Sequence, residues 1–131
     1  MIYHYDEALE EIEEALSDLI EENKSTPVIV EGEKDEEALR RLGLTGRIIR
    51  LNTGVSLSDF CDKVSANYET VILLIDWDRR GGRLFSMIKK QFRGRVKYNT
   101  VYRDVFAKRS MIRTVEGLPS WIRTMEKRRL K

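Results

Sequence analysis

The spacing of apolar residues changes along the 131-residue chain, from helical periods to short unbroken runs and back. Residues 6–23 place an apolar side chain every three or four positions among acidic ones, which predicts an amphipathic helix. The apolar stripe consists of Ile2, Tyr5, Leu9, Ile12, Leu16 and Leu19. The stripe is too short to require a coiled-coil partner. We therefore expect it to pack on the protein's own sheet, with a dimer seam as the alternative.

Short apolar runs bounded by turn residues predict four strands further along the chain. These runs are residues 27–30, 47–51, 71–75 and 96–102. Between them, helical spacing predicts three helices that end near Gly43, Asn67 and Phe92. Ser56 or Ser58 can cap the second of these helices. Strands that alternate with helices indicate an α/β fold, with a four-stranded, mainly parallel sheet and helices on both faces.

The last part of the chain, residues 104–131, predicts two short basic helices. Asp104 can cap the first, and Pro119 suits the first turn of the second. No repeat, low-complexity tract or interdomain linker interrupts the sequence. Residues 1–131 are therefore expected to form a single domain, which is the usual outcome for this length.

Charged residues make up 35% of the chain, and the two signs are segregated. Residues 1–40 carry 14 acidic and 3 basic residues, whereas residues 79–131 carry 17 basic and 3 acidic ones. A strongly basic half is the usual footprint of a polyanion and predicts nucleic acid as a partner, with a merely solvated surface as the alternative. The acidic face of the first helix should lie away from nucleic acid or cover basic residues of the second half.

Several classes of protein are excluded by what the sequence lacks. No apolar run approaches the ~20 residues that cross a bilayer, and the first residues do not resemble a signal peptide. A lone cysteine, Cys61, cannot form an internal disulfide, so a cytoplasmic location is expected. His4 is the only histidine, which argues against a Ser-His-Asp triad and a Cys/His zinc site.

Acidic residues stand at the carboxyl ends of two of the expected strands. Glu31 follows the run 27–30 directly, and Asp76 and Asp78 follow the run 71–75. Ligands of open α/β sheets bind at the carboxyl ends of the strands, and carboxylate oxygens suit Mg²⁺. Crowded carboxylates raise one another's pKa, so such a cluster is costly without a cation. A metal site that also binds phosphate is therefore expected here.

Glycines and basic residues surround these acids. Gly32 and Gly81 are expected to let the backbone turn beside the acids, and Gly54 to form the turn after the strand 47–51. Three arginines at the helix start could grip phosphates, with a solvated helix start as the alternative. They are Arg79, Arg80 and Arg83. Trp77 is expected to pack against a neighbouring helix, with stacking on an unpaired base as the alternative.

The order of these motifs resembles the Toprim domain. The matching segments are Val28-Ile29-Val30-Glu31-Gly32-x-x-Asp35, then Gly54, then Leu74-Ile75-Asp76-x-Asp78-x-x-Gly81. Type IA and type II topoisomerases, bacterial-type primases, old-family nucleases and small ribosomal-RNA maturases share this catalytic module. The resemblance covers about residues 25–107 and implies a Rossmann-like Toprim core, extended by the helix 6–23 and by residues 104–131. The chain looks like a free-standing small Toprim protein.

The resemblance also implies roles for individual residues. Asp76 and Asp78 match the paired acids that hold Mg²⁺, as one ion or two, with Mn²⁺ as a possible substitute. Glu31 matches the glutamate that acts as general acid/base and can join the metal shell. Asp35 is expected to buttress the following helix, with metal binding as the alternative. Arg79 matches an arginine of type IA topoisomerases, whereas Trp77 departs from the small residue or proline usual between the two aspartates.

The function expected from these residues is Mg²⁺-dependent phosphodiester hydrolysis in RNA or DNA by metal-activated water. The chain lacks the context of a topoisomerase tyrosine and the zinc domain of a primase, so strand passage and primer synthesis are not expected. The alternative is a nucleic-acid- or nucleotide-binding accessory module without catalysis, within a DNA repair, replication or RNA-processing complex.

Overall fold

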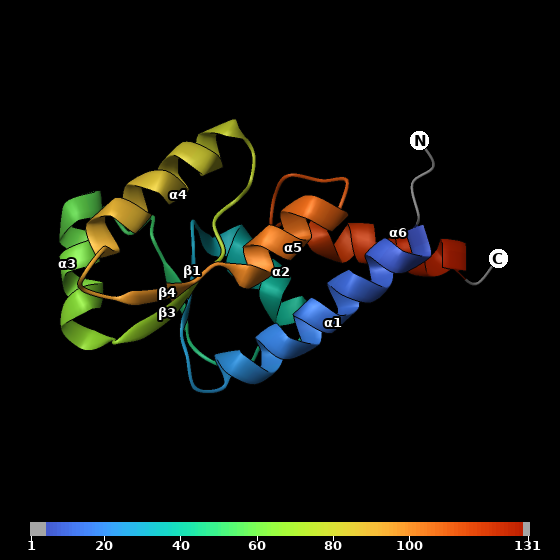
Figure 1. Cartoon of the computed structure of the whole chain (residues 1–131), viewed down its shortest axis with the longest axis horizontal. Helices are drawn as coiled ribbons and strands as arrows, with labels where there is room; N and C mark the ends of the chain where they lie inside the picture. Colours follow the sequence, from blue (N-terminus) through green and yellow to red (C-terminus); the bar gives the residue numbers. More distant parts are fainter. Residues whose placement is uncertain (1–4, 130–131) are drawn as a thin grey trace.

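Four short parallel strands form the centre of the molecule (Figure 1). The computed structural model describes residues 5–129. The strands are β1 (Val28–Val30), β2 (Ile48–Arg50), β3 (Thr70–Leu73) and β4 (Lys97–Asn99). Their order in the sheet is β2-β1-β3-β4, and every neighbouring pair is parallel. The predicted α/β class is confirmed, and the sheet is parallel throughout rather than mainly.

Six helices in the described part of the chain cover the two faces of the sheet (Figure 1). They are α1 (Tyr5–Asn23), α2 (Glu33–Arg41), α3 (Leu57–Asn67), α4 (Arg79–Phe92), α5 (Val101–Arg109) and α6 (Leu118–Arg129). Helices α3 and α4 lie on one face, and α1, α2, α5 and α6 lie on the other. None of these helices combines the length and apolar character that a bilayer crossing requires.

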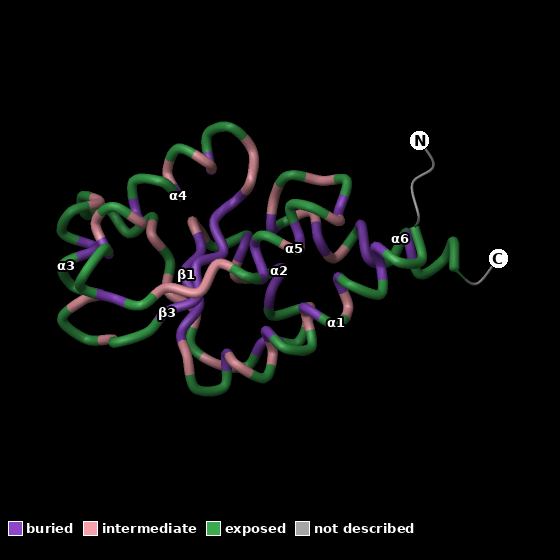
Figure 2. Tube along the Cα trace, viewed as in Figure 1, coloured by how far each residue is buried: buried purple, intermediate pink, exposed green. Residues whose placement is uncertain are grey.

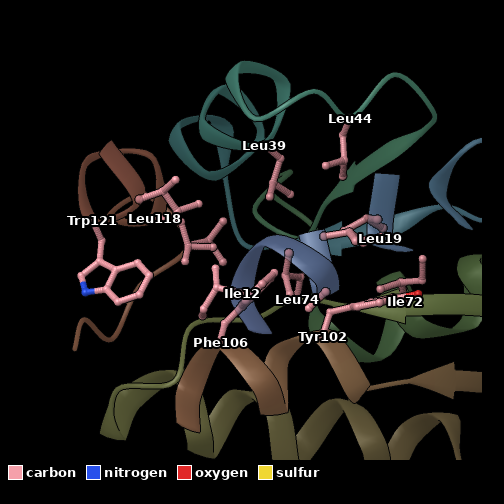
Figure 3. Close-up of a cluster of buried hydrophobic side chains, with 14 of the residues drawn as sticks. Ile12, Leu19, Leu39, Leu44, Ile72, Leu74, Tyr102, Phe106, Leu118 and Trp121 are labelled. Carbon is pink, nitrogen blue, oxygen red and sulfur yellow. The ribbon is translucent and has the colours of Figure 1, made fainter. Parts of the chain in front are cut away.

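Successive residues of the strands feed two separate cores, because side chains alternate between the faces of a sheet. Ile29, Leu73 and Ile75 pack with side chains of α3 and α4. Val30, Ile72 and Leu74 pack on the opposite face with α1, α5 and α6 (Figure 3). The two central strands, β1 and β3, are consequently almost entirely buried, whereas the edge strands β2 and β4 are partly exposed (Figure 2).

The apolar stripe of α1 packs chiefly on α5 and α6 and joins the same core as one face of the sheet. Leu9, Ile12 and Leu19 are each 1% exposed or less, so the chain itself covers the stripe. Packing within the protein, rather than a dimer seam, is thus the arrangement that the structure shows. The acidic face of α1 in turn covers basic residues of the second half, as one of the two alternatives predicted.

The structure corrects the sequence-based boundaries after the third strand. The fourth strand ends at Asn99, not at residue 102, because Tyr102 is already in α5 and packs one helical turn from Phe106. Asp104 lies inside the first turn of α5 and does not cap it. Pro119 is in the first turn of α6, as predicted. The expectations for Ile2 and His4 fall outside the described residues.

Candidate active site at the carboxyl edge of the sheet

The topology creates a crevice between the carboxyl ends of β1 and β3. The chain leaves β1 for β2 on one side of it, then crosses back to β3 on the other side. Such a switch point is where ligands bind in open α/β sheets. A hollow of about 640 Å³ lies at this edge. Its acidic lining residues are Glu31, Glu33, Asp35, Asp76 and Glu116.

Glu31 and Asp76 meet around one guanidinium group. Nη2 of Arg80 lies 2.6 Å from Oε2 of Glu31 and 3.8 Å from Oδ2 of Asp76. The hydrogen bond to Glu31 raises the pKa of Arg80 above its ordinary value. The other carboxylate oxygen of Glu31, Oε1, is buried and has no hydrogen-bond partner within the described part of the chain. Arg80 therefore offsets negative charge of Glu31 and Asp76 and is not free to bind a phosphate.

Asp76 is the most perturbed acid of the site. Its side chain is buried, and Oδ1 accepts a hydrogen bond of 2.8 Å from the backbone N–H of Val115. The pKa of Asp76 is raised to about 6, chiefly by loss of solvent and further by the negative charges of Asp35, Glu31 and Asp78. The Val115 hydrogen bond opposes it. Asp76 thus lies in an environment where a cation would be strongly favoured.

Asp78 has a different position from its predicted partner Asp76. It is the N-cap residue of α4, and its Oδ1 accepts a hydrogen bond of 2.7 Å from the backbone N–H of Gly81. It does not line the hollow, although its charge acts on Asp76. The structure therefore brings Glu31 and Asp76 together and leaves Asp78 at the margin, with one carboxylate oxygen committed to the helix.

The glycines near the acids differ in what they contribute. A Cβ added at Gly81 would lie 2.2 Å from the carbonyl oxygen of Asp76, so only glycine lets the helix start this close to the strand end. Gly54 has a φ of +85° and forms the predicted turn. The backbone bends at Gly32 as expected, but its φ of −154° is extended and a Cβ there would meet nothing within 4 Å, so the bend does not require glycine. Any residue can adopt that backbone.

Asp35 buttresses the start of α2, as the sequence suggested. Its Oδ2 accepts a hydrogen bond of 3.2 Å from the backbone N–H of Gly32. Burial raises the pKa of Asp35, and the charges of Glu31 and Glu116 raise it further. Asp35 is therefore part of the same crowded set of carboxylates, even though its hydrogen bond is structural.

The buried Arg103 binds the backbone just after β3, and the sequence analysis did not identify it. Arg103 donates from Nε to the carbonyl oxygen of Ile75 at 2.7 Å and from Nη2 to that of Asp76 at 2.9 Å. Its guanidinium carbon lies 3.7 Å from the centroid of the Phe85 ring. Burial lowers the pKa of Arg103, and the charges of nearby acids, Asp76 among them, oppose that change.

The loop between α5 and α6 closes the site from the other side. It supplies the N–H of Val115 to Asp76 and places the exposed Glu116 on the hollow. These contacts join residues about 40 positions apart, and no local pattern in the sequence marks them. Chain topology alone brings the loop to the strand ends.

Trp77 packs against α5, which confirms the first of its two interpretations. Its indole N–H donates to the carbonyl oxygen of Ile112 at 2.7 Å, and its ring centroid lies 6.2 Å from that of Phe106. Its backbone N–H donates to the carbonyl oxygen of Arg113 at 2.9 Å. Trp77 thus anchors the turn between the two aspartates to the loop that covers Asp76.

Helix α4 presents an uncompensated basic face beside the hollow. Its sequence contains five basic residues and no acidic one. Arg79 and Arg83 are exposed and form no ion pair with any residue in the described range 5–129. They remain available for the phosphate contacts that the sequence suggested, whereas Arg80 is engaged with the acids.

The residues of the hollow suit a divalent cation in chemistry but do not form a ready cage. Within residues 5–129, no three His, Cys, Asp or Glu side chains lie close enough together to hold a metal ion as they stand. Glu31 and Asp76 nevertheless offer only carboxylate oxygens, the ligands that Mg²⁺ prefers, and Oε1 of Glu31 lacks a partner in this part of the chain. The side chain of Arg80 is 61% exposed, so it can move into solvent and free both acids.

Comparison with known proteins shows relatives over most of the chain. The UPF0292 protein of Thermoplasma volcanium is 41% identical over 103 residues, which cover 75% of this chain and 83% of the relative. That of Methanocaldococcus jannaschii is 37% identical over 120 residues, which cover 89% and 94%. A solved structure from Aquifex aeolicus has a TM-score of 0.68 at 26% identity and covers 79% of this chain and 94% of its own. No family model matches the chain.

Proposed function

The chain belongs to the UPF0292 protein family, and we propose that it is a Mg²⁺-dependent Toprim protein that hydrolyses phosphodiester bonds in RNA or DNA. One observation carries the proposal: the carboxylates of Glu31 and Asp76 converge on a single cationic group at the switch point of the sheet. Two largely buried carboxylates that share an exposed arginine are well suited to exchange it for a divalent cation. The buried, unpaired thiol of Cys61 agrees with a cytoplasmic location.

Glu31 and Asp76 would hold Mg²⁺, or Mn²⁺ in its place, and Asp78 would add the carboxylate oxygen that does not cap α4. The negative charges of Glu31 and Asp78 both act on Asp76, so Asp76 is the residue of the three that would also help to hold a second ion. A bound ion of this kind neutralises a phosphate oxygen and lowers the pKa of its water. Asp76 would bind the cation in its ionised form, because metal ligands must be deprotonated.

The other residues of the site would orient the substrate and move protons. Arg80, once released from the acids, would turn to the phosphate and form charge-assisted hydrogen bonds with its oxygens. Glu31 has one carboxylate oxygen with no hydrogen-bond partner among the described residues, which suits an acceptor of the proton from the attacking water. Arg79 and Arg83 would contact the flanking phosphates along α4.

The direct test is cleavage of a labelled hairpin RNA and a nicked DNA with Mg²⁺ or Mn²⁺ and with EDTA. We expect metal-dependent cleavage that Glu31→Gln and Asp76→Asn reduce at least about 100-fold. Glu37→Gln is the matched control, because it removes an exposed charge from α2 outside the acidic hollow. Cleavage that persists unchanged in both site variants would contradict the proposal.

Non-catalytic binding is the second candidate, and the pairing of Arg80 with both acids favours it. If Arg80 stays in place, it offsets part of the negative charge of Glu31 and Asp76 and occupies the position between them that a metal would take. The chain would then bind a polynucleotide through the basic face of α4, alone or within a larger complex. Salt-sensitive binding with intact strands, in the presence of metal, would support this candidate over hydrolysis.

A further inference from the structure

A second hollow, of about 470 Å³, lies between the edge strand β2 and helix α3. We call it the edge groove; it is lined by Arg47, Ile49, Arg50, Thr53, Val55, Asp59, Phe60, Lys63, Val64, Asn67 and Tyr68. Val55 lines both this groove and the acidic hollow, so the two are contiguous. The groove starts at the candidate active site and leads away from it along the edge of the sheet.

The edge groove is positively charged. Arg47, Arg50 and Lys63 line it, against a single acid, Asp59. Arg50 is partly neutralised by Glu36 at 2.7 Å. Lys63 is exposed and has no ion pair within residues 5–129. This charge is opposite in sign to that of the neighbouring hollow and matches a chain of phosphates.

The far end of the groove carries an aromatic ring. Tyr68 follows the last residue of α3, whereas Val55 lies two positions before its first, so Ser56 and the full length of the helix, 11 residues, separate the two. At about 1.5 Å per residue this is roughly 16 Å. A stacked strand advances about 3.4 Å per nucleotide, so several nucleotides fit along this distance. The hydroxyl of Tyr68 accepts a hydrogen bond of 2.9 Å from Nη1 of Arg47, which places a cation beside the ring.

We propose that the edge groove binds the single-stranded segment of polynucleotide that flanks the phosphodiester in the acidic hollow. The identity of the occupant rests on the proposed function. Cations that track a backbone, together with an aromatic ring on which a base can stack, are the features of single-strand binding sites. The groove thereby assigns a direction to the substrate: its single-stranded end lies along β2 and α3, and its other flank lies on α4.

Binding of a fluorescent 12-residue oligothymidylate, measured by anisotropy in EDTA, tests this groove without the metal site. We expect Lys63→Ala and Arg47→Ala to weaken binding about 5- to 10-fold each. Each should also reduce the slope of log affinity against log salt concentration by about 0.7. Lys108→Ala, an exposed change on α5, is the control and should leave both quantities unchanged.

A stacking role for Tyr68 predicts that Tyr68→Phe retains the preference for this oligomer over an abasic one of equal length, and that Tyr68→Leu loses it. Groove variants that bind like the wild type, or that lose no more than Lys108→Ala, would overturn the proposal. Glu31→Gln separates the two proposals, because it should reduce cleavage at least about 100-fold without weakening binding in EDTA. If the wild type never cleaves but the groove variants lose binding, hydrolysis alone is refuted. If the wild type cleaves substrates with single-stranded overhangs and the groove variants cleave them equally well, the groove alone is refuted.

Discussion

Acidic side chains form ion pairs with arginines in two regions of this molecule, and the two arrangements differ in how many acids share each arginine. On α1 two acids each have their own partner: Glu11 lies 2.6 Å from Arg109, and Glu13 lies 2.9 Å from Arg129. At the strand ends one exposed arginine serves Glu31 and Asp76 together, and further acids crowd around them. The first arrangement balances charge at the surface, whereas the second leaves buried negative charge in excess.

The difference shows which charges are free to do chemistry. Two arginines of the basic second half, Arg109 and Arg129, are paired with acids of α1, so the total charge of that half overstates what it can offer to a polyanion. Apart from Arg80, the basic residues of α4 form no ion pair within residues 5–129. Excess acid next to excess base, at a switch point of the sheet, is the arrangement that a metal ion and a phosphate would complete.

The largest expected effect comes from removing the arginine beneath the strand end. Arg103→Met should destabilise the fold by about 3 kcal/mol, since it leaves the buried carbonyls of Ile75 and Asp76 without their charged donor. Urea unfolding measures this. Arg123→Met, an exposed change on α6, should stay within about 0.5 kcal/mol. Equal losses in the two variants would mean that Arg103 does not support the site specifically.

The excess acid should be visible in the pH dependence of stability. The pKa of Asp76 is about 6 in the folded protein and 3.8 for an unperturbed aspartate, as in the unfolded chain, so the folded chain binds this proton more tightly. Its contribution is therefore full below pH 4, falls as the pH rises from about 4 to 6 and is then constant. The total fall is at most about 3 kcal/mol.

Asp76→Asn should remove that fall, because the amide oxygen still accepts the Val115 hydrogen bond without carrying charge. The variant should consequently be more stable than the wild type at pH 7 while losing function, the usual trade-off at a site under charge strain. A wild-type profile that is identical to that of Asp76→Asn between pH 4 and 6 would show that the acids are not crowded.

Two adjacent glycines differ in how closely they approach the strand end: Gly81 lies against Asp76, and Gly82 does not. Gly81→Ala should destabilise by about 1–3 kcal/mol, because its Cβ would collide with the carbonyl oxygen of Asp76. Gly82→Ala meets nothing within 4 Å and should be neutral or stabilising by about 0.5–1 kcal/mol. Thermal unfolding of both variants gives the comparison, and the opposite order would contradict the close approach of helix and strand.

The smallest effects should come from the matched pairs of α1. Glu11→Gln and Glu13→Gln should each change the free energy of unfolding by less than about 1 kcal/mol, because exposed ion pairs contribute little. Neither variant should change the pH profile between 4 and 6. A large loss in either one would place the energetic weight of the charges on α1 rather than on the strand ends.

The contrast also explains what the sequence could predict. Apolar runs and helical spacing located the elements, because burial on a sheet imposes those periods. Glu31 and Asp76 could be identified because parallel strands bring their carboxyl ends to one edge. Arg103, Val115 and Glu116 could not, since their positions depend on how α5 and α6 fold back over that edge.

The residues that departed from expectation did so for local reasons. The spacing grouped Asp78 with Asp76, but one carboxylate oxygen of Asp78 accepts a hydrogen bond from the N–H of Gly81 in the first turn of α4. Arg80 was expected to be free for a phosphate, but the nearby acids attract its guanidinium group. Tyr102 continued the alternation of the last strand, yet its spacing to Phe106 is equally that of a helix.

The most direct test of the central claim is thermal unfolding at pH 7 as Mg²⁺ is titrated. If Glu31 and Asp76 form a cation site, the melting temperature should rise with concentration by mass action, equivalent to about 2.7 kcal/mol at 100 times the dissociation constant. The rise should vanish in Asp76→Asn and persist in Glu13→Gln. A melting temperature that ignores Mg²⁺ and Mn²⁺, or that rises equally in Asp76→Asn, would contradict the account.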